Sequence, residues 1–491
     1  MPFIRSKRAR WVLLVLLASL PLIGWWSYGL FDLDEGFYAS VTGSMIRHHE
    51  WITPLYNGHP WFEKPILIYW LAKPAVTLFG QSFGPRLPSV LATIATYAVV
   101  AWFVRRRIGA MAAVMSLFVL GSSILVVAIG RMIMTDGPLL FFFTAAMLAY
   151  WESIVGDPRW KLATAACLGF AVLAKGPVAI ILFFLIAIAW HFGSRQLNLR
   201  SDRNYESEMR LWSMGTLLLI SIIAFWYAPA YSANGQTFVQ EFLIKQNIGR
   251  FTGGDSAHTL SFLKSFYFYI PILLVGMFPW ILWLPAAVKS RVDPIHRYLV
   301  AWAAIIFIFF TISGAKLPHY ILPCCPPIAI LVGSYFANRW QQLSREQVRS
   351  KLLLTLAWLV TCWVIVQVGF EWWYVKSGQM EAHTFARFIA DHKDEGRRVV
   401  SYQLSRRNKD LGTGKAKILE TSLPSLSFYV NEDMEETDDI SKIENGPKPA
   451  WIFTRKGRID DSHPSDPFRG QLDARQNGEY FEVFRVTGPK G

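Results

Sequence analysis

The chain has 491 residues, of which 53% are apolar and only 17% are charged, and this balance excludes an ordinary soluble protein of that length. The net charge of +14 does not require a nucleic-acid partner, because a membrane protein can carry its excess Lys and Arg in loops that face the cytoplasm and its anionic lipid. We therefore expect membrane lipid, and no nucleic acid, around this chain.

Eleven apolar runs approach the length of about 20 residues that crosses the hydrocarbon core of a bilayer. The first follows a basic N-terminus and has no cleavage site after it, so we interpret it as an uncleaved span and not as a signal peptide. The fifth and sixth are short and are separated by Lys175-Gly176-Pro177, which predicts a broken or re-entrant span. The runs lie at about 11–31, 88–104, 110–130, 137–155, 162–175, 177–193, 211–231, 268–288, 298–313, 318–337 and 352–374.

Basic residues mark one side of these runs. With the N-terminus inside, every inside segment contains Arg or Lys, which is the positive-inside pattern. Two long segments, 32–87 and 232–267, then lie outside the cytoplasm. The first holds amphipathic stretches at about 36–48 and 65–80, which we expect to lie along the membrane interface. The inside segments are 1–10, 105–109, 156–161, 194–210, 289–297 and 338–351.

The composition changes after Trp373, and the rest of the chain is charged and has no spanning run. The stretch 381–396 has the spacing of an amphipathic helix, and five short apolar segments are typical of strands. We therefore predict a transmembrane domain over residues 1–375 and a soluble α/β domain over 376–491, outside the cytoplasm. The predicted strands are 397–403, 416–421, 425–430, 450–456 and 480–486.

The four cysteines lie within apolar runs and have neither zinc-site spacing nor the framework of a disulfide-rich domain. We interpret them as small core residues. They are Cys167, Cys324, Cys325 and Cys362.

The first extracytoplasmic segment opens with Asp32-Leu33-Asp34-Glu35, which places three carboxylates directly after a span. Carboxylates so near hydrocarbon are costly unless they are solvated, paired or used, and a carboxylate can serve as a general base. The alternatives are a solvated loop start and the D-x-D metal motif of nucleotide-sugar enzymes. The second alternative fits poorly, because no Rossmann-type domain surrounds the triplet.

Glu63 and Lys64 stand between aromatic residues and prolines in 58–65, which predicts a stiff, non-helical turn. Lys64 can meet a phosphate as a point charge, and Glu63 can orient it or bind a divalent cation. The alternative is an ordinary surface ion pair, which contributes little to stability.

Three more candidates stand at the outer ends of spans. Asp136 lies at the junction of the third and fourth spans, where it is either a helix N-cap or a functional carboxylate. Arg131 beside it is a candidate phosphate ligand. Lys175 precedes a Gly-Pro break that can aim its ammonium at an anionic headgroup, and the alternative is a lysine that snorkels to the interface.

Two loops complete the candidate cations. The segment 247–258 combines Arg250 and His258 with flexible glycines and could close over a lipid-phosphate headgroup. Lys316 lies between the ninth and tenth runs, on the same outer side. A phosphate leaving group and a hydroxyl nucleophile would require such cations and carboxylates at one membrane surface. The predicted topology gathers Lys64, Lys175 and Lys316 there with Asp34, Glu63 and Asp136.

Five motifs occur in order over most of residues 30–335: LDEGFYASVTGSMIRHHEWITPLYNGHPWFEKPILIYWL, PRLPSVLA, MTDGPLL, LAKGPVA and SGAKLPHYILPCCPP. In these motifs and their order the chain resembles the C-type glycosyltransferase superfamily. It is most similar to the branch that contains lipid A 4-amino-4-deoxy-L-arabinose transferases and related protein mannosyltransferases. The resemblance implies a helical spanning bundle with a small C-terminal periplasmic α/β domain. This agrees with the count of about eleven spans from the apolar runs and with the interfacial helices expected in the first periplasmic loop (32–87).

The resemblance also implies an activity and a location. The family carries out an inverting transfer of a sugar from an undecaprenyl-phosphate or other polyprenyl-phosphate donor. The acceptor would be lipid A, another envelope glycan or a protein, on the periplasmic side of a bacterial inner membrane, with the N-terminus cytoplasmic. A protein O-glycosyltransferase of the same fold stays an alternative. A lipid or sugar transporter or flippase is another, although ionisable residues near the midplane and related halves are not visible here.

Carried over by position, Asp34 is the acidic catalytic residue, and Glu35 and Asp136 complete the carboxylates of the site. A divalent cation is a feature of parts of the family, and Glu63 and His258 are its candidate ligands here; no other cofactor is expected. Phe37 stands where the family often has Arg, so the sugar and the acceptor stay open. The residues expected to bind the donor phosphate are Lys64, Arg131, Lys175, Arg250 and Lys316.

Overall fold

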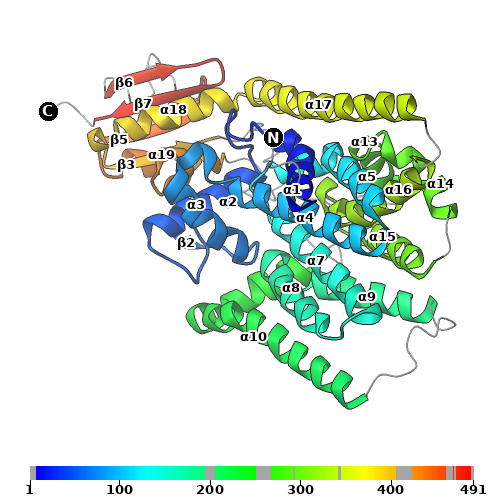
Figure 1. Ribbon diagram of the computed structural model, residues 1–491. Coiled ribbons are helices and arrows are strands. Elements are labelled where there is room, and N and C mark those ends of the chain that lie inside the picture. Colours follow the sequence, from blue (N-terminus) through cyan, green and yellow to red (C-terminus); the bar gives the residue numbers. More distant parts are fainter. Residues whose placement is uncertain are drawn as a thin grey trace. The chain divides into compact units, whose positions relative to one another are not determined.

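The computed structural model divides the chain into two compact units (Figure 1). The helical unit comprises Met1–Trp25, Phe62–Ile68 and Arg86–Gln367, and the mixed unit comprises Trp26–Trp61, Tyr69–Pro85 and Val368–Gly491. The structure describes residues 7–193, 205–249, 267–290, 293–340, 344–404, 423–459, 468 and 471–487.

Apolar helices of very different lengths build the helical unit. In chain order they are α1 (Lys7–Ala18), η2 (Leu20–Leu22), α4 (Leu87–Arg107), α5 (Ala110–Gly121), α6 (Ile124–Gly130), α7 (Asp136–Val155), α8 (Trp160–Lys175), α9 (Val178–Gly193), α10 (Tyr205–Phe238), the π-helical η3 (Val239–Gly249), α13 (Tyr269–Gly276), η4 (Trp280–Trp283), α14 (Leu284–Lys289), α15 (Pro294–Ile312), η5 (Pro318–Cys324), α16 (Cys325–Trp340) and α17 (Arg345–Lys376). The last of these continues past Gln367 into the mixed unit.

Within the described residues, six helices are long and apolar enough to cross a membrane. Two bent pairs, α5 with α6 at 65° and α13 with η4 and α14 at 107°, raise the number to eight if each pair is one span. Eight of the eleven apolar runs thus correspond to a candidate span or to a bent pair. The six helices are Leu87–Arg107, Asp136–Val155, Glu206–Gln246, Pro294–Ile312, Pro318–Trp340 and Leu353–Lys376.

The other three runs are interrupted. The first is a 12-residue helix, α1, followed by a 3₁₀ turn that contains Pro21. Helices α8 and α9 have 16 residues each, and Gly176 separates them with a φ of +97°, which confirms the predicted break. Sixteen residues make a helix about 24 Å long, which is shorter than the roughly 30 Å hydrocarbon core. The structure therefore confirms a multi-spanning helical protein, and the count of eleven stays a prediction.

The mixed unit combines helices with short strands. The two amphipathic stretches of the first long segment are indeed helices, α2 (Asp34–Arg47) and α3 (Leu67–Phe83), although α3 starts in the helical unit. The other elements are β1 (Leu55–Tyr56), β2 (His59–Pro60), α18 (Gln379–Asp391), η6 (Lys393–Glu395), β3 (Arg398–Tyr402), α19 (Ser425–Val430), β4 (Glu435–Thr437), α20 (Ile440–Glu444), β5 (Ala450–Arg455), β6 (Leu472–Asn477) and β7 (Phe481–Val486).

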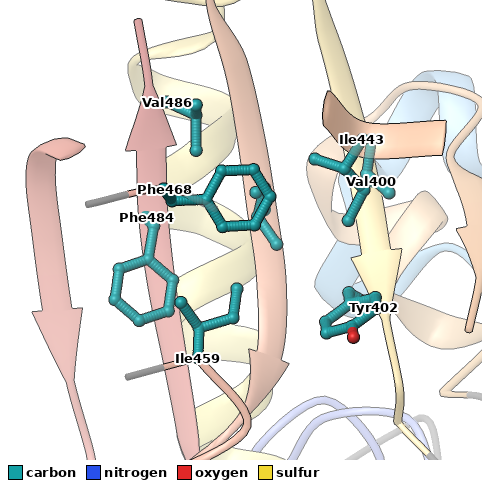
Figure 2. Packing of buried hydrophobic residues seen from close by; sticks show 8 residues of the cluster. Val400, Tyr402, Ile443, Ile459, Phe468, Phe484 and Val486 are labelled. Carbon is teal, nitrogen blue, oxygen red and sulfur yellow. The ribbon is translucent and has the colours of Figure 1, made fainter. Parts of the chain in front are cut away.

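A five-stranded sheet of order β4-β3-β5-β7-β6 forms the core of the C-terminal region. Strand β3 is parallel to β4 and β5, whereas β7 is antiparallel to β5 and β6. Val400, Ile452 and Phe484 stand opposite one another on the three central strands, and their side chains enter one buried cluster (Figure 2). Burying an apolar side chain of this size stabilises a fold by about 1.5–3 kcal/mol, so this face holds the sheet together.

One predicted strand is wrong, because residues 425–430 form the helix α19. The alternation of serine with large residues suggested a strand with one buried face, but all six side chains are buried. Pro424 precedes the helix and Asn431 ends it with a φ of +59°. The predicted strand 416–421 lies outside the described residues.

The edge strands β4 and β6 were not predicted, since neither has the apolar alternation of a half-buried strand. The mixed unit also groups the segments Trp26–Trp61 and Tyr69–Pro85 with the C-terminal region. A division at residue 375, which the composition suggests, would separate these two segments from the C-terminal region.

Candidate functional site

A buried ion pair joins the ends of two helices in the helical unit. Asp136 is the first residue of α7 and Lys175 the last of α8, and Lys175 Nζ lies 2.5 Å from Asp136 Oδ1. Asp136 is 1% exposed. Each charge complements the dipole of its own helix, since a carboxylate is favoured at an N-terminus and an ammonium at a C-terminus.

His319 and Lys64 add positive charge around Asp136. His319, in η5, places Nε2 3.8 Å from Asp136 Oδ2. Lys64 is half-buried, and its charge also acts on Asp136. Lys175 further lies over the ring of Tyr320, 4.5 Å from its centre. The structure thus brings together three of the predicted residues, and it adds His319, which the sequence analysis did not select.

Asp136 is not the N-cap of α7, so that alternative is wrong. Thr135 occupies the N-cap position, and no side chain makes a capping hydrogen bond there. The carboxylate turns instead to Lys175. Glu63, next to Lys64, is half-buried.

Lys316 has an unexpected role at the end of α15. It is buried, and its ammonium donates hydrogen bonds to the carbonyl oxygens of Phe310, Thr311 and Ser313 at 2.6, 2.7 and 2.5 Å. These carbonyls belong to the last turn of the helix, where intrahelical donors run out. Burial also lowers the pKa of Lys316. In this structure, therefore, the lysine closes a helix end instead of presenting its three donors to a ligand.

The remaining predicted ligands are placed only in part. Arg131 follows α6, is fully buried, and donates a hydrogen bond to Gln367. Arg250 and His258 lie outside the described residues. Across the described residues, no group of three or more His, Cys, Asp or Glu side chains could hold a metal ion.

In the mixed unit, the LDE motif forms the start of α2. Asp34 is the first residue of the helix and is exposed. Glu35 is fully buried and accepts a hydrogen bond of 3.0 Å from the backbone N–H of Phe31. This bond holds the chain at the start of the helix, where Asp34 is exposed.

Asp32, two residues before Asp34, connects α2 to the C-terminal region. Its two carboxylate oxygens accept the backbone N–H of Ser425 at 2.9 Å and the Ser425 hydroxyl at 2.5 Å. The Ser425 Oγ also lies 2.8 Å from Nε2 of His383, whose Nδ1 lies 3.0 Å from the Tyr374 hydroxyl. Burial raises the pKa of Asp32 to about 7, although the two bonds from Ser425 oppose that shift.

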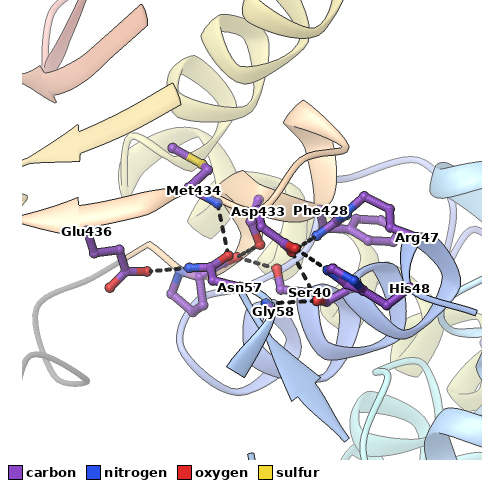
Figure 3. A network of polar contacts seen from close by, with 12 residues as sticks. Ser40, Arg47, His48, Asn57, Gly58, Phe428, Asp433, Met434 and Glu436 are labelled. Carbon is purple, nitrogen blue, oxygen red and sulfur yellow. Dashed lines mark hydrogen bonds and ion pairs between the residues drawn. The ribbon is translucent and has the colours of Figure 1, made fainter. Parts of the chain in front are cut away.

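A second polar network joins the other end of α2 to the segment before β4 (Figure 3). Asp433 accepts hydrogen bonds from Arg47 at 2.6 Å and from Ser44 at 3.0 Å, and it pairs with His48 at 2.5 Å. Burial by itself would raise the pKa of Asp433, but these hydrogen bonds and the charge of Arg47 outweigh it and lower the pKa.

The short hairpin β1–β2 is held by the same C-terminal segment. Glu436 accepts hydrogen bonds from the Tyr56 hydroxyl and from Asn57. Burial raises the pKa of Glu436, against the effect of these two bonds. The C-terminal region therefore contacts α2 at its start and its end, and the hairpin after it.

Sequence reasoning missed most of the residues that connect α2 and the hairpin to the C-terminal region. Asp32 stood in the noticed carboxylate cluster but was not selected, and no local pattern marks Ser425, His383 or Asp433. Phe37, which stands where the family often has Arg, stacks on Trp61 with ring centres 5.0 Å apart and an interplanar angle of 12°.

Comparisons with known proteins show what the chain is similar to. Residues 10–239 match the family described as dolichyl-phosphate-mannose-protein mannosyltransferase. The undecaprenyl phosphate-alpha-4-amino-4-deoxy-L-arabinose arabinosyl transferase of Edwardsiella ictaluri is 30% identical over 348 residues, 67% of this chain and 60% of that protein. Its counterpart in Shewanella sediminis is 31% identical over 343 residues, 66% and 59%. The chain thus spans about three fifths of the length of these relatives.

Solved structures extend the likeness to the whole fold. The crystal structure of ArnT from Cupriavidus metallidurans bound to undecaprenyl phosphate matches 99% of this chain and 100% of that one, with a TM-score of 0.76 and 19% identity. The arabinofuranosyltransferase AftD from Mycobacteria matches 99% of this chain and 40% of its own, with a TM-score of 0.51 and 12% identity. The helical bundle with a small C-terminal sheet is therefore a fold shared with these proteins.

Proposed function

Because the chain is related to the C-type glycosyltransferases of the aminoarabinose-transferase and mannosyltransferase branch, we propose that it is a membrane glycosyltransferase. It transfers a sugar from an undecaprenyl-phosphate or other polyprenyl-phosphate donor to lipid A or another envelope glycan. The observation that carries the proposal is the gathering of Lys175, His319 and Lys64 around the buried Asp136. Such a cluster suits a phosphate leaving group at the end of a helical bundle.

In the proposed reaction an acceptor hydroxyl displaces the phosphate from the anomeric carbon in line, which inverts that carbon. The bond from the anomeric carbon to the phosphate oxygen breaks, and its electron pair leaves with the phosphate. Asp34 takes the proton of the hydroxyl as general base. Lys64 and Lys175 neutralise the charge that grows on the phosphate, and Asp136 keeps the Lys175 ammonium in place.

The other candidates have supporting parts in this proposal. Glu35 fixes the first turn of α2 beneath Asp34. Arg131, Arg250 and Lys316 are further cations for the phosphate, although Lys316 would first have to release the carbonyls it holds. The polyprenyl tail would lie along the apolar helices.

A divalent cation stays an expectation from the family resemblance. The described residues do not form a metal centre, and of the two predicted ligands only Glu63 is described. The proposed reaction passes no step through a metal. Transfer measured after dialysis against a chelator, and again after Mg²⁺ or Mn²⁺ is restored, tests the expectation directly.

The proposed setting is a bacterial inner membrane, with a cytoplasmic N-terminus and a periplasmic site and C-terminal region. The basic segments on one side of the apolar runs support this orientation. Reporter fusions in 156–161 and after residue 487 should report the cytoplasm and the periplasm, respectively. A reversed pattern would overturn the orientation and with it the periplasmic site.

The decisive experiment compares a deletion strain complemented with the wild-type protein, with Asp34→Asn or with Asp293→Asn. Mass spectrometry of lipid A and envelope glycans should show one sugar missing in the Asp34→Asn strain, because loss of a general base costs about 10²–10⁴ in rate. Asp293 is the N-cap of α15 and accepts a hydrogen bond from the His296 N–H, so Asn can replace it there.

Full transfer by a correctly inserted Asp34→Asn protein would refute the assignment of the base. If the same sugar is missing from protein in place of lipid A, the acceptor is a protein Ser or Thr. Movement of a lipid across liposomes without a new covalent bond would instead indicate a flippase.

A further inference from the structure

The helical unit contains a cavity of about 370 Å³ that the proposed reaction does not use. This volume falls within the usual range of small-molecule pockets. The walls come from α5, the segment Pro279–Trp283, the end of α16 and the start of α17. The lining includes the aromatic residues Phe118, Trp280, Trp283, Phe336, Trp340 and Trp358.

The cavity lies far from the proposed phosphate site. Helices η5 and α16 form one candidate span, Pro318–Trp340. His319 stands at its first turn, beside Asp136, and Arg339 stands at its last turn and lines the cavity. Twenty residues of helix separate the two, or about 30 Å, which is the thickness of the hydrocarbon core. The cavity and the Asp136 cluster therefore lie at opposite faces of the membrane.

Two cations stand at the cavity, Arg339 and Lys351. Both are exposed, and Arg339 packs its guanidinium over the ring of Tyr335, 4.7 Å from the ring centre. Both belong to the segment 338–351, which the positive-inside pattern places in the cytoplasm. An apolar pocket with basic residues at the cytoplasmic face has the chemistry of a binding site for anionic lipid headgroups.

A hydrogen-bond donor in the wall of the cavity points the same way, since Trp358 is one of the lining residues. The indole N–H of Trp358 is buried and has no hydrogen-bond partner within the described residues. An indole nitrogen only donates, so an acceptor oxygen of a bound ligand would satisfy it. Trp358 follows Lys351 by seven residues, about two turns or roughly 11 Å along α17. A donor that is deeper than the cations suits an ester carbonyl below a phosphate.

The wall formed by α17 is open to the lipid. Only 22% of the apolar 18-residue stretch within the span Leu353–Lys376 is buried, and Leu354, which lines the cavity, is 67% exposed. An acyl chain can therefore enter from the bilayer without leaving hydrocarbon. The fixed aromatic walls support a defined pose, since Trp280 donates a hydrogen bond of 2.8 Å to Ser122.

We propose that this cavity binds one anionic glycerophospholipid of the membrane. Its phosphate lies between Arg339 and Lys351, a carbonyl oxygen accepts the Trp358 N–H, and an acyl chain fills the aromatic pocket. The site binds a structural lipid and is separate from the donor site. The inference rests on the membrane fold and is independent of the proposed transfer reaction.

The test uses native mass spectrometry of the purified full-length protein, delipidated and then offered equal amounts of phosphatidylglycerol and phosphatidylcholine. The wild-type protein should retain one phosphatidylglycerol, with at least tenfold preference over phosphatidylcholine. The variant Arg339→Gln/Lys351→Gln should lose that preference. Trp358→Phe should weaken retention severalfold, because it removes the N–H and keeps the aromatic wall.

The matched control is Arg210→Gln/Arg297→Gln, which removes two exposed cations from predicted cytoplasmic segments that do not line the cavity. Its phosphatidylglycerol retention should stay within twofold of wild type. Thr355→Trp fills the cavity while leaving both cations, and it should also abolish retention.

Equal retention in the wild-type and the Arg339→Gln/Lys351→Gln proteins would overturn the proposal. So would equal binding of phosphatidylcholine, or displacement of the lipid by an equal amount of undecaprenyl phosphate, since the occupant would then be the carrier lipid.

Discussion

At the scale of single residues, the carboxylates differ in their burial and in their hydrogen-bond partners. Asp136 is buried with Lys175, and Asp32 is held by a serine. Asp34 is exposed at a helix start. A base that must meet a substrate hydroxyl needs access, whereas a buried carboxylate is better suited to hold another group. The division of roles among the three residues rests on this difference.

The first prediction concerns the pair Asp136–Lys175. Lys175→Met should destabilise the protein by about 3–5 kcal/mol, because it leaves a buried carboxylate without its main partner. The double variant Asp136→Leu/Lys175→Met should cost less than the sum of the single variants. Thermal unfolding in detergent measures both effects.

The surface pair Lys245–Glu241 is the control, since it is exposed and spans i to i+4. Lys245→Met should change stability by no more than about 0.5 kcal/mol. Additive costs at Asp136 and Lys175 would show that the two side chains do not interact in solution.

The second prediction concerns the pH dependence that Asp32 introduces. The unfolded chain releases this proton near the ordinary pKa of 3.8, and the folded chain releases it near 7. The folded state therefore binds the proton more tightly, and this contribution to stability is complete below about pH 4. It falls as the pH rises and is lost above about pH 7.

Melting temperatures of wild type and Asp32→Asn, measured from pH 4 to pH 8, test this expectation. Wild type should lose stability relative to the variant between pH 4 and pH 7, with no further change above that. Parallel curves over the whole range would show that Asp32 ionises at an ordinary pKa.

At the scale of elements, the ends of helices carry much of the site. Helix α8 ends at Lys175 because Gly176 adopts a φ of +97°, which L side chains rarely adopt. Helix α7 begins with Asp136, which is why the two charges can meet. Helix α15 ends at Ile312, and Lys316 folds back to hold its last carbonyls.

The third prediction follows from that helix end. Lys316→Met should destabilise the protein by about 2–4 kcal/mol, because several buried carbonyls lose charged donors. Lys316→Arg should recover part of the loss. Thermal unfolding gives the stability, and transfer assays on the folded fraction separate stability from function.

A Lys316→Met protein with wild-type stability and no transfer activity would contradict this interpretation. It would instead indicate that the lysine binds the donor phosphate.

At the scale of the whole molecule, the mixed unit is assembled from parts that are distant in sequence. The segment Trp26–Trp61 carries Asp34, and the C-terminal region supplies its hydrogen-bond partners Ser425 and Asp433. The C-terminal region is therefore a structural component of the unit that presents the proposed base.

The fourth prediction is that a chain ending at residue 375 loses activity although it retains Asp34 and every other proposed catalytic residue. Residues 26–61 should become sensitive to protease, because α2 loses its bonds to Ser425 and Asp433. Limited proteolysis and transfer assays of inserted protein measure the two effects. If the truncated protein is digested as slowly as the wild type and is equally active, the C-terminal region does not have this structural role.

The sequence by itself determined the properties that depend on local composition and spacing. These are the membrane class, most of the apolar helices, the break at Gly176, the two helices in the segment 32–87 and three of the sheet's strands. The motifs also indicated the resemblance to C-type glycosyltransferases, because their order along the chain is independent of any three-dimensional arrangement.

Only the tertiary structure decided which partner each polar group has. Asp32 and Ser425 are 393 residues apart, and no local pattern can indicate such a bond. The segment 425–430, which the sequence predicted as a strand, is a helix with all six side chains buried. Lys316 binds carbonyls instead of a predicted phosphate because the chain after α15 turns back on the helix end. Hydrogen bonds and burial depend on what the fold brings close, and sequence patterns report only the neighbours along the chain.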